Sequence, residues 1–266
     1  MTNEGIAPVR WGVLGAANIA LAKVIPAMQR SALAEVVAIA SRDIAKARAA
    51  ANRLGIERAY GSYQELIDDP DIEAIYNPLP NHLHVPWSIR AAERGKHVLC
   101  EKPIALTARE ARDLLEARDR TGVHIGEAFM VRTHPQWLGV REIIASGKIG
   151  EMRLITGHFS YYKRDPGDIR SRPEWGGGAL MAMGCYTVEV ARELFGPAPN
   201  EVAGVVERDQ WSEASEAARG LKVAAPERSA CRTGYGDAGQ LGRLAGPMSK
   251  SSYGQYVLAL LRDPVL

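Results

Sequence analysis

The chain has 266 residues, of which 46% are hydrophobic and 24% are charged, and this composition is typical of a soluble globular protein. The formal net charge of +2 gives no reason to expect binding to nucleic acid or to a membrane surface, and no apolar run approaches membrane-spanning length. The opening segment MTNEGIAPVR shows no export signal, and the three cysteines form no CxxC pair. We therefore expect a cytoplasmic protein with neither a disulfide framework nor a metal site.

The first half of the chain alternates between short apolar runs and helical segments. One helical segment begins with a capping signal, Thr107 followed three residues later by Glu110. The alternation predicts βαβ units and a mostly parallel sheet, which is an α/β fold. Strands are expected at 9–15, 35–41, 58–60, 73–80 (strand, then turn), 96–100 and 122–129, and helices at 18–30, 43–55, 62–67, 82–95 and 107–122.

After about residue 130 the pattern changes. A helix is expected at 134–150, an exposed strand at 151–163, a glycine-rich entry to a helix at 176–196, and another strand at 201–207. Helices and strands in this order predict a second domain of the α+β class.

The C-terminal segment has an unusual composition. From Asp209 to Ser252 there is no Ile and no Phe, and Val223 is the only Val. Such a stretch buries too little apolar area to offset the entropy of ordering, so much of it is expected to be poorly ordered or only weakly helical. The domains expected are therefore a nucleotide-binding domain at 1–128, a partial α+β domain at 129–208 and an atypical tail at 209–266.

The first expected strand runs into a turn that resembles a dinucleotide fingerprint. In G-x-G-x-x-G/A, Gly15 provides the tight turn and Ala20 the small residue where the helix packs on the strand. Ala17 replaces the second glycine, and its methyl group narrows the approach for a pyrophosphate. An ordinary βα turn is the alternative to a cofactor site. The candidate cofactor-binding residues of this turn are Gly15, Ala16, Ala17, Asn18 and Ile19.

The second expected strand ends without the carboxylate that binds the ribose of NAD. It ends instead in Ser41 and Arg42, with Lys46 one turn into the next helix. A hydroxyl, a guanidinium and an ammonium would bind a 2′-phosphate, which favours NADP over NAD. Asp43 suits the N-terminus of the helix better than a ribose contact. The alternative is that both cations are solvated charges on the helix surface.

A later strand end carries further candidate cofactor contacts. Leu79, Asn81 and His84 follow the strand that begins at residue 73, where side chains can line a nicotinamide and its ribose. His82 is interpreted as a surface histidine. His82 and His84 together do not suit a metal ion, because residues i and i+2 point to different faces of a helix.

The strand expected at 96–100 is followed by Glu101, Lys102 and Pro103. The carboxyl ends of parallel strands are where ligands bind to open α/β sheets. The charged pair is therefore either half of a site or a surface salt bridge.

Several separated motifs resemble one family in order and spacing. They are the Gly15 turn, NPLPNHLH, the tripeptide EKP within CEKP, EAFMVRTHPQW, and GGGALMAMGCY at 176–186. These motifs resemble the Gfo/Idh/MocA oxidoreductases, and look most like the branch of NADP-dependent D-xylose dehydrogenases and dimeric dihydrodiol dehydrogenases. The resemblance covers about residues 8–207. It implies an N-terminal Rossmann domain and a C-terminal α+β domain with an open, mostly antiparallel sheet, which would be incomplete here.

The resemblance also implies a reaction and its catalytic residues. A hydroxyl group of a sugar or a related cyclic diol would lose its proton while hydride moves from carbon to C4 of NADP⁺. The family's lysine maps onto Lys102 and its tyrosine onto Tyr186. The lysine ammonium favours the phenolate form of the tyrosine and stabilises negative charge on the reacting oxygen. Glu101 would orient Lys102 or contact the nicotinamide ribose.

Other residues are implied with less direct roles. Arg132 is a candidate cofactor contact, and Arg170 a candidate substrate contact. His158 and Tyr161 lie on the strand that the family uses as the floor of its active site, and exposed strand residues are the alternative there.

Two departures from the family pattern bear on activity. Ala182 stands where the family commonly has Asp, and the chain leaves the pattern near residue 208. One alternative is therefore an NADP-binding protein of the same fold with little or no catalysis. A different reduction on the same scaffold is a third hypothesis. Relatives form homodimers or larger homo-oligomers, and this is doubtful for a chain with an altered C-terminus.

Overall fold

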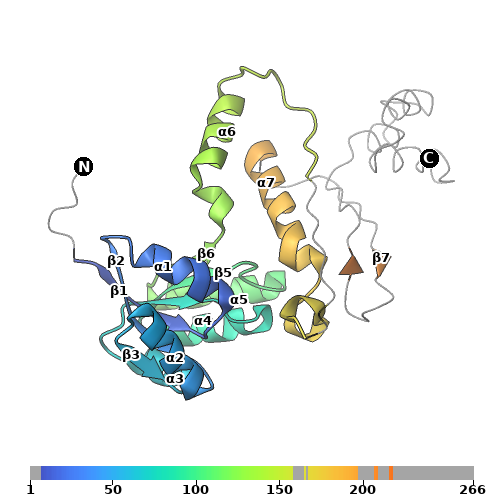
Figure 1. Ribbon diagram of the computed structural model, residues 1–266. Helices are drawn as coiled ribbons and strands as arrows, with labels where there is room; N and C mark the ends of the chain where they lie inside the picture. The colour runs from blue at the N-terminus through green and yellow to red at the C-terminus, as the bar shows by residue number, and fades with distance from the viewer. Residues whose placement is uncertain (1–6, 158–164, 166, 197–206, 209–215, 218–266) are drawn as a thin grey trace. The chain divides into compact units, whose positions relative to one another are not determined.

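The computed structural model describes residues 7–157, 165, 167–196, 207–208 and 216–217 (Figure 1). The chain divides into two compact units. The first unit comprises Met1–Met130 and Gly167–Gly177, and the second comprises Val131–Pro166 and Gly178–Leu266. The segment Gly167–Gly177 thus groups with the N-terminal part of the chain, although it follows the second domain's first helix in the sequence.

A six-stranded parallel sheet forms the centre of the first unit (Figure 1). The strand order is β3-β2-β1-β4-β5-β6, and every neighbouring pair is parallel. This order confirms the predicted α/β class and is that of a Rossmann-like fold. The strands are β1 Val9–Leu14, β2 Ala34–Ala40, β3 Arg58–Tyr60, β4 Ala74–Asn77, β5 His97–Glu101 and β6 Ile125–Ala128.

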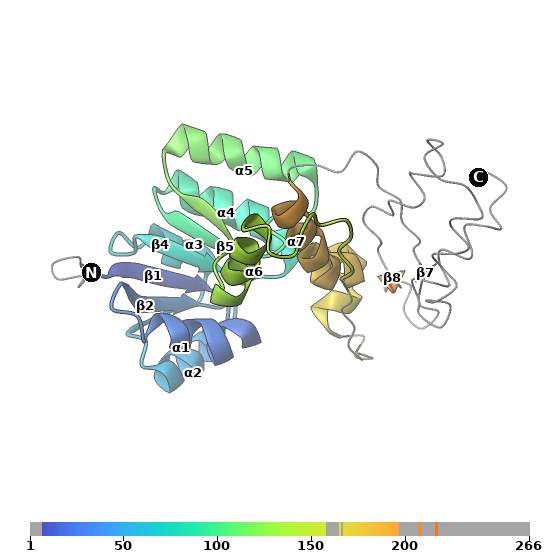
Figure 2. The same cartoon turned by 90° about the horizontal axis from the view of Figure 1, so that it is seen from above.

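Helices cover both faces of this sheet (Figure 2). Seen from above, α1 and α2 lie on one face, and α4 and α5 lie on the other. The segment expected as one helix at 18–30 forms a π-helical turn followed by α1. The helical elements are η1 Ala20–Val24, α1 Ile25–Met28, α2 Ile44–Leu54, α3 Tyr63–Asp68, η2 Asn81–Leu83, α4 His84–Glu93 and α5 Ala108–Thr121.

The core has one apolar layer on each face of the sheet. Successive strand residues belong to different layers, because side chains alternate across a strand. Ile75 packs in the layer that also contains residues of α3 and α4, and Tyr76 in the layer that contains residues of η1, α1 and α2. Both side chains are completely buried.

The predicted helix boundaries of the first unit have clear physical causes. In α2 the Asp43 carboxylate accepts hydrogen bonds from the amides of Ala45 and Lys46, and Gly55 ends the helix with a left-handed φ of 65°. In α5 the capping box of Thr107 and Glu110 is present. Both the N-terminal role of Asp43 and the capping box are thereby confirmed.

The second unit contains the two helices expected in it. These are α6 Pro135–Ala145 and α7 Cys185–Phe195, the latter preceded by the π-helical turn η6 Leu180–Gly184. The helix predicted over 134–150 is shorter, because Gly147 and Gly150 adopt positive φ values of 70° and 72° after it. Neither α6 nor α7 contains a buried side chain.

The strand predicted at 151–163 is not formed over residues 151–157, and the remainder lies outside the described residues. A strand exists only where a neighbouring segment accepts and donates its hydrogen bonds, which an alternating pattern alone does not supply. Of the strand predicted at 201–207, only Glu207 is described, in β7 Glu207–Arg208, which pairs with β8 Glu216–Ala217. The predicted tail otherwise lies outside the described residues.

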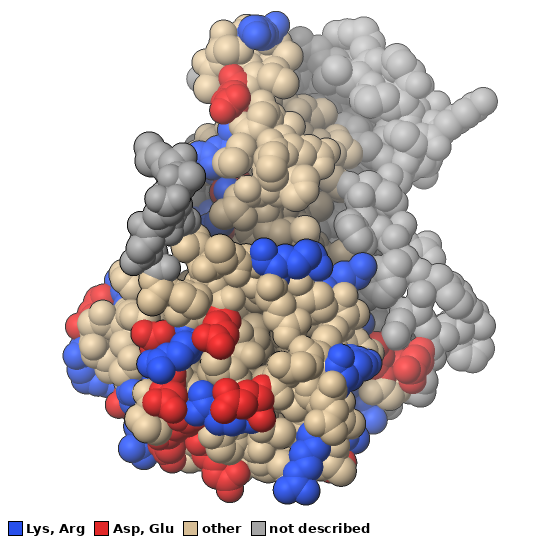
Figure 3. All heavy atoms as spheres, turned by 60° about the vertical axis from the view of Figure 1, so that its left-hand side comes forward, with Lys and Arg blue, Asp and Glu red and all other residues tan. Residues whose placement is uncertain are grey.

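The charges on the surface are of both signs. Lys and Arg side chains are interspersed with Asp and Glu on the face in Figure 3, in line with a net charge of only +2. Within the described ranges, none of the helices has the length and apolar character that a membrane crossing needs.

Candidate functional site

The carboxyl ends of β1, β4 and β5 meet at one edge of the parallel sheet. β1 pairs with β4, and β4 pairs with β5 up to Asn77 and Cys100. The segments that follow these strands begin with Gly15, Pro78 and Lys102, so three separately predicted motifs lie along one edge. This edge is the ligand-binding edge of open α/β sheets.

The Gly15 turn is built so that no side chain fits at its first residue. Gly15 has a φ of 84°, and its amide donates to the carbonyl of Ala40 at 2.7 Å. A Cβ atom at this position would lie 2.9 Å from Cδ2 of Leu79. The turn therefore joins the ends of β1 and β2 and packs closely on the loop after β4. A narrow, backbone-lined turn of this kind suits a pyrophosphate.

The other residues of the turn divide into packed and exposed ones. Ala16 and Ala17 pack against the α1–α2 layer, and Ala20 is completely buried, as helix–strand packing requires. Asn18 and Ile19 are exposed, Ile19 to 47%.

The end of β2 carries two solvent-facing cations. Ser41 is buried, and its hydroxyl accepts a hydrogen bond from the amide of Asp43 at 3.2 Å. Arg42 and Lys46 are exposed. In the part of the chain that the structure describes, neither cation forms an ion pair with a carboxylate. Their charge is thus available to an anionic ligand beside the Gly15 turn.

The loop after β4 is fixed by two buried polar side chains. The Asn77 amide nitrogen donates to the carbonyl of His84 and the hydroxyl of Ser88, both at 3.1 Å. The two ring nitrogens of His84 lie 2.7 Å from the carbonyl oxygens of Pro103 and Leu79. Burial lowers the pKa of His84, although these two carbonyl oxygens favour the protonated ring. His84 therefore connects the loops after β4 and β5.

This placement changes the interpretation of His84. Its side chain is only 1% exposed, and both ring nitrogens face protein oxygens. In this structure the ring joins two loops that the sequence separates by about 20 residues, and its contact with a cofactor stays a prediction. Leu79 is also buried, at 5% exposure, and packs on the Gly15 turn.

The end of β5 carries Glu101 and Lys102. One carboxylate oxygen of Glu101 accepts a hydrogen bond from the Tyr76 hydroxyl at 2.7 Å, and the other accepts one from the Lys102 amide at 3.3 Å. The peptide bond between Lys102 and Pro103 is cis. The loop continues to Ile104, whose amide donates to Glu127 of β6 at 2.9 Å. Tyr76 and Glu127 had no signal in the sequence, because their partners lie 25 and 23 residues away.

The segment Gly167–Gly177 contacts η2 within the first unit. The Asn81 side chain donates to the carbonyl of Gly176 at 2.8 Å, and the rings of His82 and Trp175 stack with centroids 5.9 Å apart. A Cβ atom at Gly176 would clash with the side chain of Leu106. His82 is thus more than a surface histidine, and the first glycine of the GGG motif is required by this contact.

The remaining candidates divide between both units. Arg170, in the first unit, pairs with Asp168 at 3.3 Å. Arg132, in the second, forms ion pairs with Glu189 and Glu193 of α7, which compete with a cofactor contact. Tyr186 is the second residue of α7 and is half-buried, and Ala182 in η6 is 8% exposed. His158 and Tyr161 lie outside the described residues.

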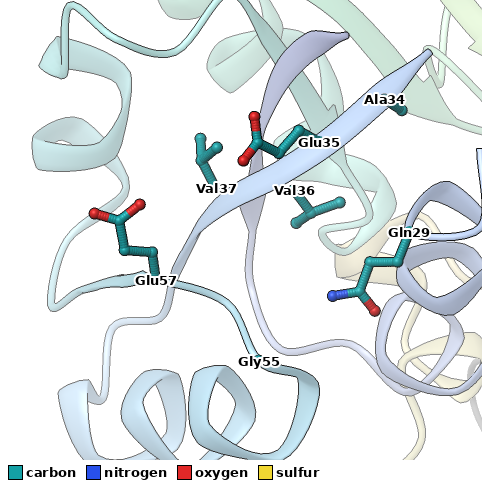
Figure 4. Close-up of a pocket in the computed structure, with 7 residues that line it drawn as sticks. All are labelled: Gln29, Ala34, Glu35, Val36, Val37, Gly55 and Glu57. Carbon is teal, nitrogen blue, oxygen red and sulfur yellow. The ribbon is translucent and has the colours of Figure 1, made fainter. Parts of the chain in front are cut away.

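A small cavity of about 210 Å³ lies away from this edge (Figure 4). It is lined by residues of the first half of β2, Ala34 to Val37, together with Gln29, Gly55 and Glu57. Its carboxylates, Glu35 and Glu57, are unsuited to a phosphate. It lies beside the amino-terminal half of β2 and is separate from the candidate cofactor site at the carboxyl ends of the strands.

Comparison with known proteins gives two family matches. Residues 9–129 match the oxidoreductase family with an NAD-binding Rossmann fold, named for Gfo, Idh and MocA, and residues 137–225 match the C-terminal domain of the same family. An uncharacterised oxidoreductase of Rhizobium meliloti is 55% identical over 201 residues, which are 76% of this chain and 60% of that protein.

Relatives with named activities match over similar lengths. D-xylose 1-dehydrogenase (NADP⁺) 2 of Haloferax volcanii is 46% identical over 187 residues, 70% of this chain and 57% of the relative. Trans-1,2-dihydrobenzene-1,2-diol dehydrogenase of Mus musculus is 33% identical over 204 residues, 75% of this chain and 60% of the relative. The chain thus spans about three fifths of the relatives it matches.

A solved structure is also similar to this chain in sequence and fold. It is a Y186F mutant of KijD10, a 3-ketoreductase of Actinomadura kijaniata, in complex with TDP-benzene and NADP. It is 37% identical, with a TM-score of 0.72, and the match covers 76% of this chain and 62% of that one. With family domains matched on both sides of residue 130 and the predicted motifs placed along one sheet edge, this chain belongs to the Gfo/Idh/MocA oxidoreductase family.

Proposed function

We propose that this protein transfers hydride between NADP(H) and the CH–OH group of a sugar or a related cyclic diol. One observation carries the proposal: the Gly15 turn, the loop after β4 and the Glu101-Lys102 pair lie along a single edge of the parallel sheet. That edge can hold a dinucleotide along its length, with the pyrophosphate at Gly15 and the nicotinamide at the end of β5. If Glu101 and Lys102 formed only a surface salt bridge, nothing would require them to lie on the same edge as the Gly15 turn and the loop after β4.

The preference for NADP rests on the end of β2. Arg42 and Lys46 are exposed there, and no carboxylate of the described residues neutralises either one. The Asp43 carboxylate is occupied by two backbone amides of α2. A 2′-phosphate would therefore meet two cations, whereas a ribose hydroxyl would find no carboxylate. The Haloferax volcanii relative is named for NADP⁺, and KijD10 was solved with NADP.

The reacting groups proposed are Lys102 and Tyr186. When bound, the nicotinamide supplies the carbon that accepts or donates hydride. The Lys102 ammonium stabilises negative charge on the substrate oxygen, and the Tyr186 phenol takes or returns the proton of that oxygen. Solved structures of KijD10 include K102A and Y186F mutants, and these residue types and numbers coincide with Lys102 and Tyr186 of this chain.

The substrate class is supported by the relatives' names, which describe a D-xylose 1-dehydrogenase, a dihydrodiol dehydrogenase and a 3-ketoreductase. All three names are of oxidoreductases, which gives no support to the alternative of a cofactor-binding protein without catalysis. Ala182 carries no carboxylate, so a substrate hydroxyl would not be bound through an Asp side chain at this position.

Turnover tests the proposal directly. The assay is NADP⁺ reduction with a panel of aldoses and trans-dihydrodiols, using the full chain and its Lys102→Met variant. Loss of the ammonium should lower kcat by about 100-fold or more, since charge on the reacting oxygen is then unsupported. Lys148→Met, which removes an exposed lysine after α6, is the matched control and should keep full activity.

Two results would contradict the assignment. Equal turnover by the Lys102→Met variant would exclude Lys102 from the reacting centre. Binding of NADPH by the wild-type chain without turnover of any substrate in the panel would instead favour the non-catalytic alternative.

A further inference from the structure

Tyr76 is a buried tyrosine whose hydroxyl reaches the end of the neighbouring strand. It lies in β4, between β1 and β5, and its side chain is 0% exposed. Most of the ring is surrounded by apolar side chains of the α1–α2 layer, including Val13 and Ile39. A phenylalanine would fill this space equally well, so packing alone does not account for a hydroxyl group.

The hydroxyl has a specific acceptor at the candidate site. It lies 2.7 Å from Oε1 of Glu101, the last residue of β5. Tyr76 is paired with Leu99 across the two strands, and Leu99 packs on the same layer as Tyr76. Glu101 follows Leu99 by two residues and so extends from the same face. The hydroxyl therefore reaches along the sheet toward its ligand-binding edge.

The second oxygen of the carboxylate is also engaged. Oε2 of Glu101 accepts a hydrogen bond from the amide of Lys102 at 3.3 Å. With Oε1 held by Tyr76, the carboxylate is fixed from the core side and from the chain that follows it. A hydrogen bond to an ionised acceptor is roughly twice as strong as one between neutral groups, so the phenol is an effective anchor.

The protonation state of Tyr76 supports this role. Burial raises the pKa of Tyr76 far above its ordinary value of 10.0, and the negative charge of Glu101 raises it further. The phenol therefore stays protonated and remains a donor throughout the working pH range. It contrasts with Tyr186, which is proposed to exchange its proton with substrate.

We propose that Tyr76 is a positioning residue of the cofactor site, which holds the Glu101 carboxylate at the end of β5 so that Glu101 meets the nicotinamide ribose in one fixed orientation. This rests on the function proposed above. Tyr76 touches neither cofactor nor substrate, and its entire effect passes through Glu101. Removing the hydroxyl leaves the carboxylate free to turn toward solvent, and the cofactor then has to bear the entropy of ordering it.

A double-mutant cycle in NADPH affinity tests this role. The four proteins are the full wild-type chain, Tyr76→Phe, Glu101→Ala and the double variant, titrated with NADPH by fluorescence. Tyr76→Phe should weaken binding about 5- to 10-fold, the effect of ordering one freed side chain when the cofactor binds. In the Glu101→Ala background the same change should have no effect, because the group it holds is already absent.

Tyr60→Phe is the matched control. The Tyr60 hydroxyl also donates to a carboxylate, Oδ2 of Asp69, at 2.8 Å, but Asp69 is not part of the candidate site. Its loss should lower thermal stability as much as the loss of the Tyr76 hydroxyl and change NADPH affinity less than twofold. If the role of Tyr76 were purely structural, Tyr76→Phe would likewise lower thermal stability and change NADPH affinity less than twofold.

Each outcome decides the proposal. Wild-type affinity in Tyr76→Phe, or equal weakening by this change with and without Glu101, overturns the positioning role and leaves the proposed function intact. Failure of the wild-type chain to bind NADPH overturns the proposed function and this role together. If Tyr76→Phe does not fold, Glu101→Ala decides, because unchanged NADPH affinity would show that no carboxylate needs to be held there.

Discussion

The two ends of the parallel sheet differ in how their charged groups are paired. Toward the amino ends of β4 and β5, charged groups are paired within the protein. The Asp69 carboxylate binds the Arg58 guanidinium at 2.6 Å and the Tyr60 hydroxyl at 2.8 Å. The ammonium of Lys96 donates to the carbonyls of Asp69 and Ile72, both at 2.7 Å.

At the carboxyl end, two cations face solvent. Arg42 and Lys46 are exposed and, within the described residues, form no ion pair. The paired charges at the amino end stabilise the fold, and the two unpaired cations at the carboxyl end belong to the cofactor site proposed above. Charges paired inside the protein contribute to folding, whereas exposed, unpaired charges contribute little to folding and can be neutralised by a bound anion.

The largest effect is expected at the amino end, on stability alone. Asp69→Ala removes the acceptor of the Tyr60 hydroxyl and the nearer carboxylate partner of Arg58, which still has Asp71 at 3.3 Å. The free energy of unfolding, measured with urea, should fall by about 3 kcal/mol, because the partly buried Arg58 loses its nearer carboxylate and the Tyr60 hydroxyl loses its acceptor. NADPH affinity at temperatures where the variant is folded should not change.

The same variant gives a pH signature. Burial alone would raise the pKa of Asp69, but the Asp71 amide, the Tyr60 hydroxyl and the Arg58 guanidinium hold it below its ordinary value of 3.8. A lowered pKa in the folded state contributes stability above pH of about 4 that is lost as the pH falls through the folded-state value. The stability difference between wild type and Asp69→Ala should therefore shrink below pH 4. Asp119→Ala, which breaks an exposed pair with Arg118, should cost under about 0.5 kcal/mol at any pH.

The second effect is expected at the carboxyl end, on cofactor choice alone. Arg42→Asp exchanges a cation beside the Gly15 turn for an anion. NADPH affinity should fall by about 1–3 kcal/mol, since a charge-assisted hydrogen bond is lost, while NADH affinity and the free energy of unfolding stay nearly constant. The ratio of the two dissociation constants is the measured quantity. Arg53→Asp, at the C-terminal end of α2 and so far from Arg42, should leave the ratio as in wild type.

An unchanged ratio in Arg42→Asp would mean that Arg42 is a solvated surface charge. A large loss of stability in the same variant would contradict the claim that the exposed cations at the carboxyl end contribute little to folding.

The sequence predicted the first unit well because its signals are local. Strand alternation, the capping box at Thr107 and the left-handed residue at Gly55 depend on neighbours within a few positions. Positions at strand ends could also be predicted, because parallel strands bring their carboxyl ends to one edge.

The contacts within the site could not be predicted in the same way. Tyr76 meets Glu101 across 25 residues, and Asn81 meets Gly176 across 95. Such pairs leave no periodic pattern in the sequence. The structural role of His84 was missed for this reason, because its two carbonyl partners are set by the fold and not by neighbouring residues.

The second unit illustrates the same limit for strands. An alternating pattern predicted a strand at 151–163, yet residues 151–157 form none. The helices of this unit also carry exposed apolar side chains, such as Ile143 of α6 and Phe195 of α7. An amphipathic pattern predicts the helix itself, but it does not predict which segment packs on its apolar face.

Hydrogen exchange of the wild-type chain with and without NADPH tests the central claim most directly. If a dinucleotide occupies the carboxyl edge, amide protection should rise at residues 15–20, 41–46, 79–84 and 101–104 and stay constant at 69–73 and 96–98. Unchanged protection at the first four segments, or an equal rise at the amino end, would contradict the account.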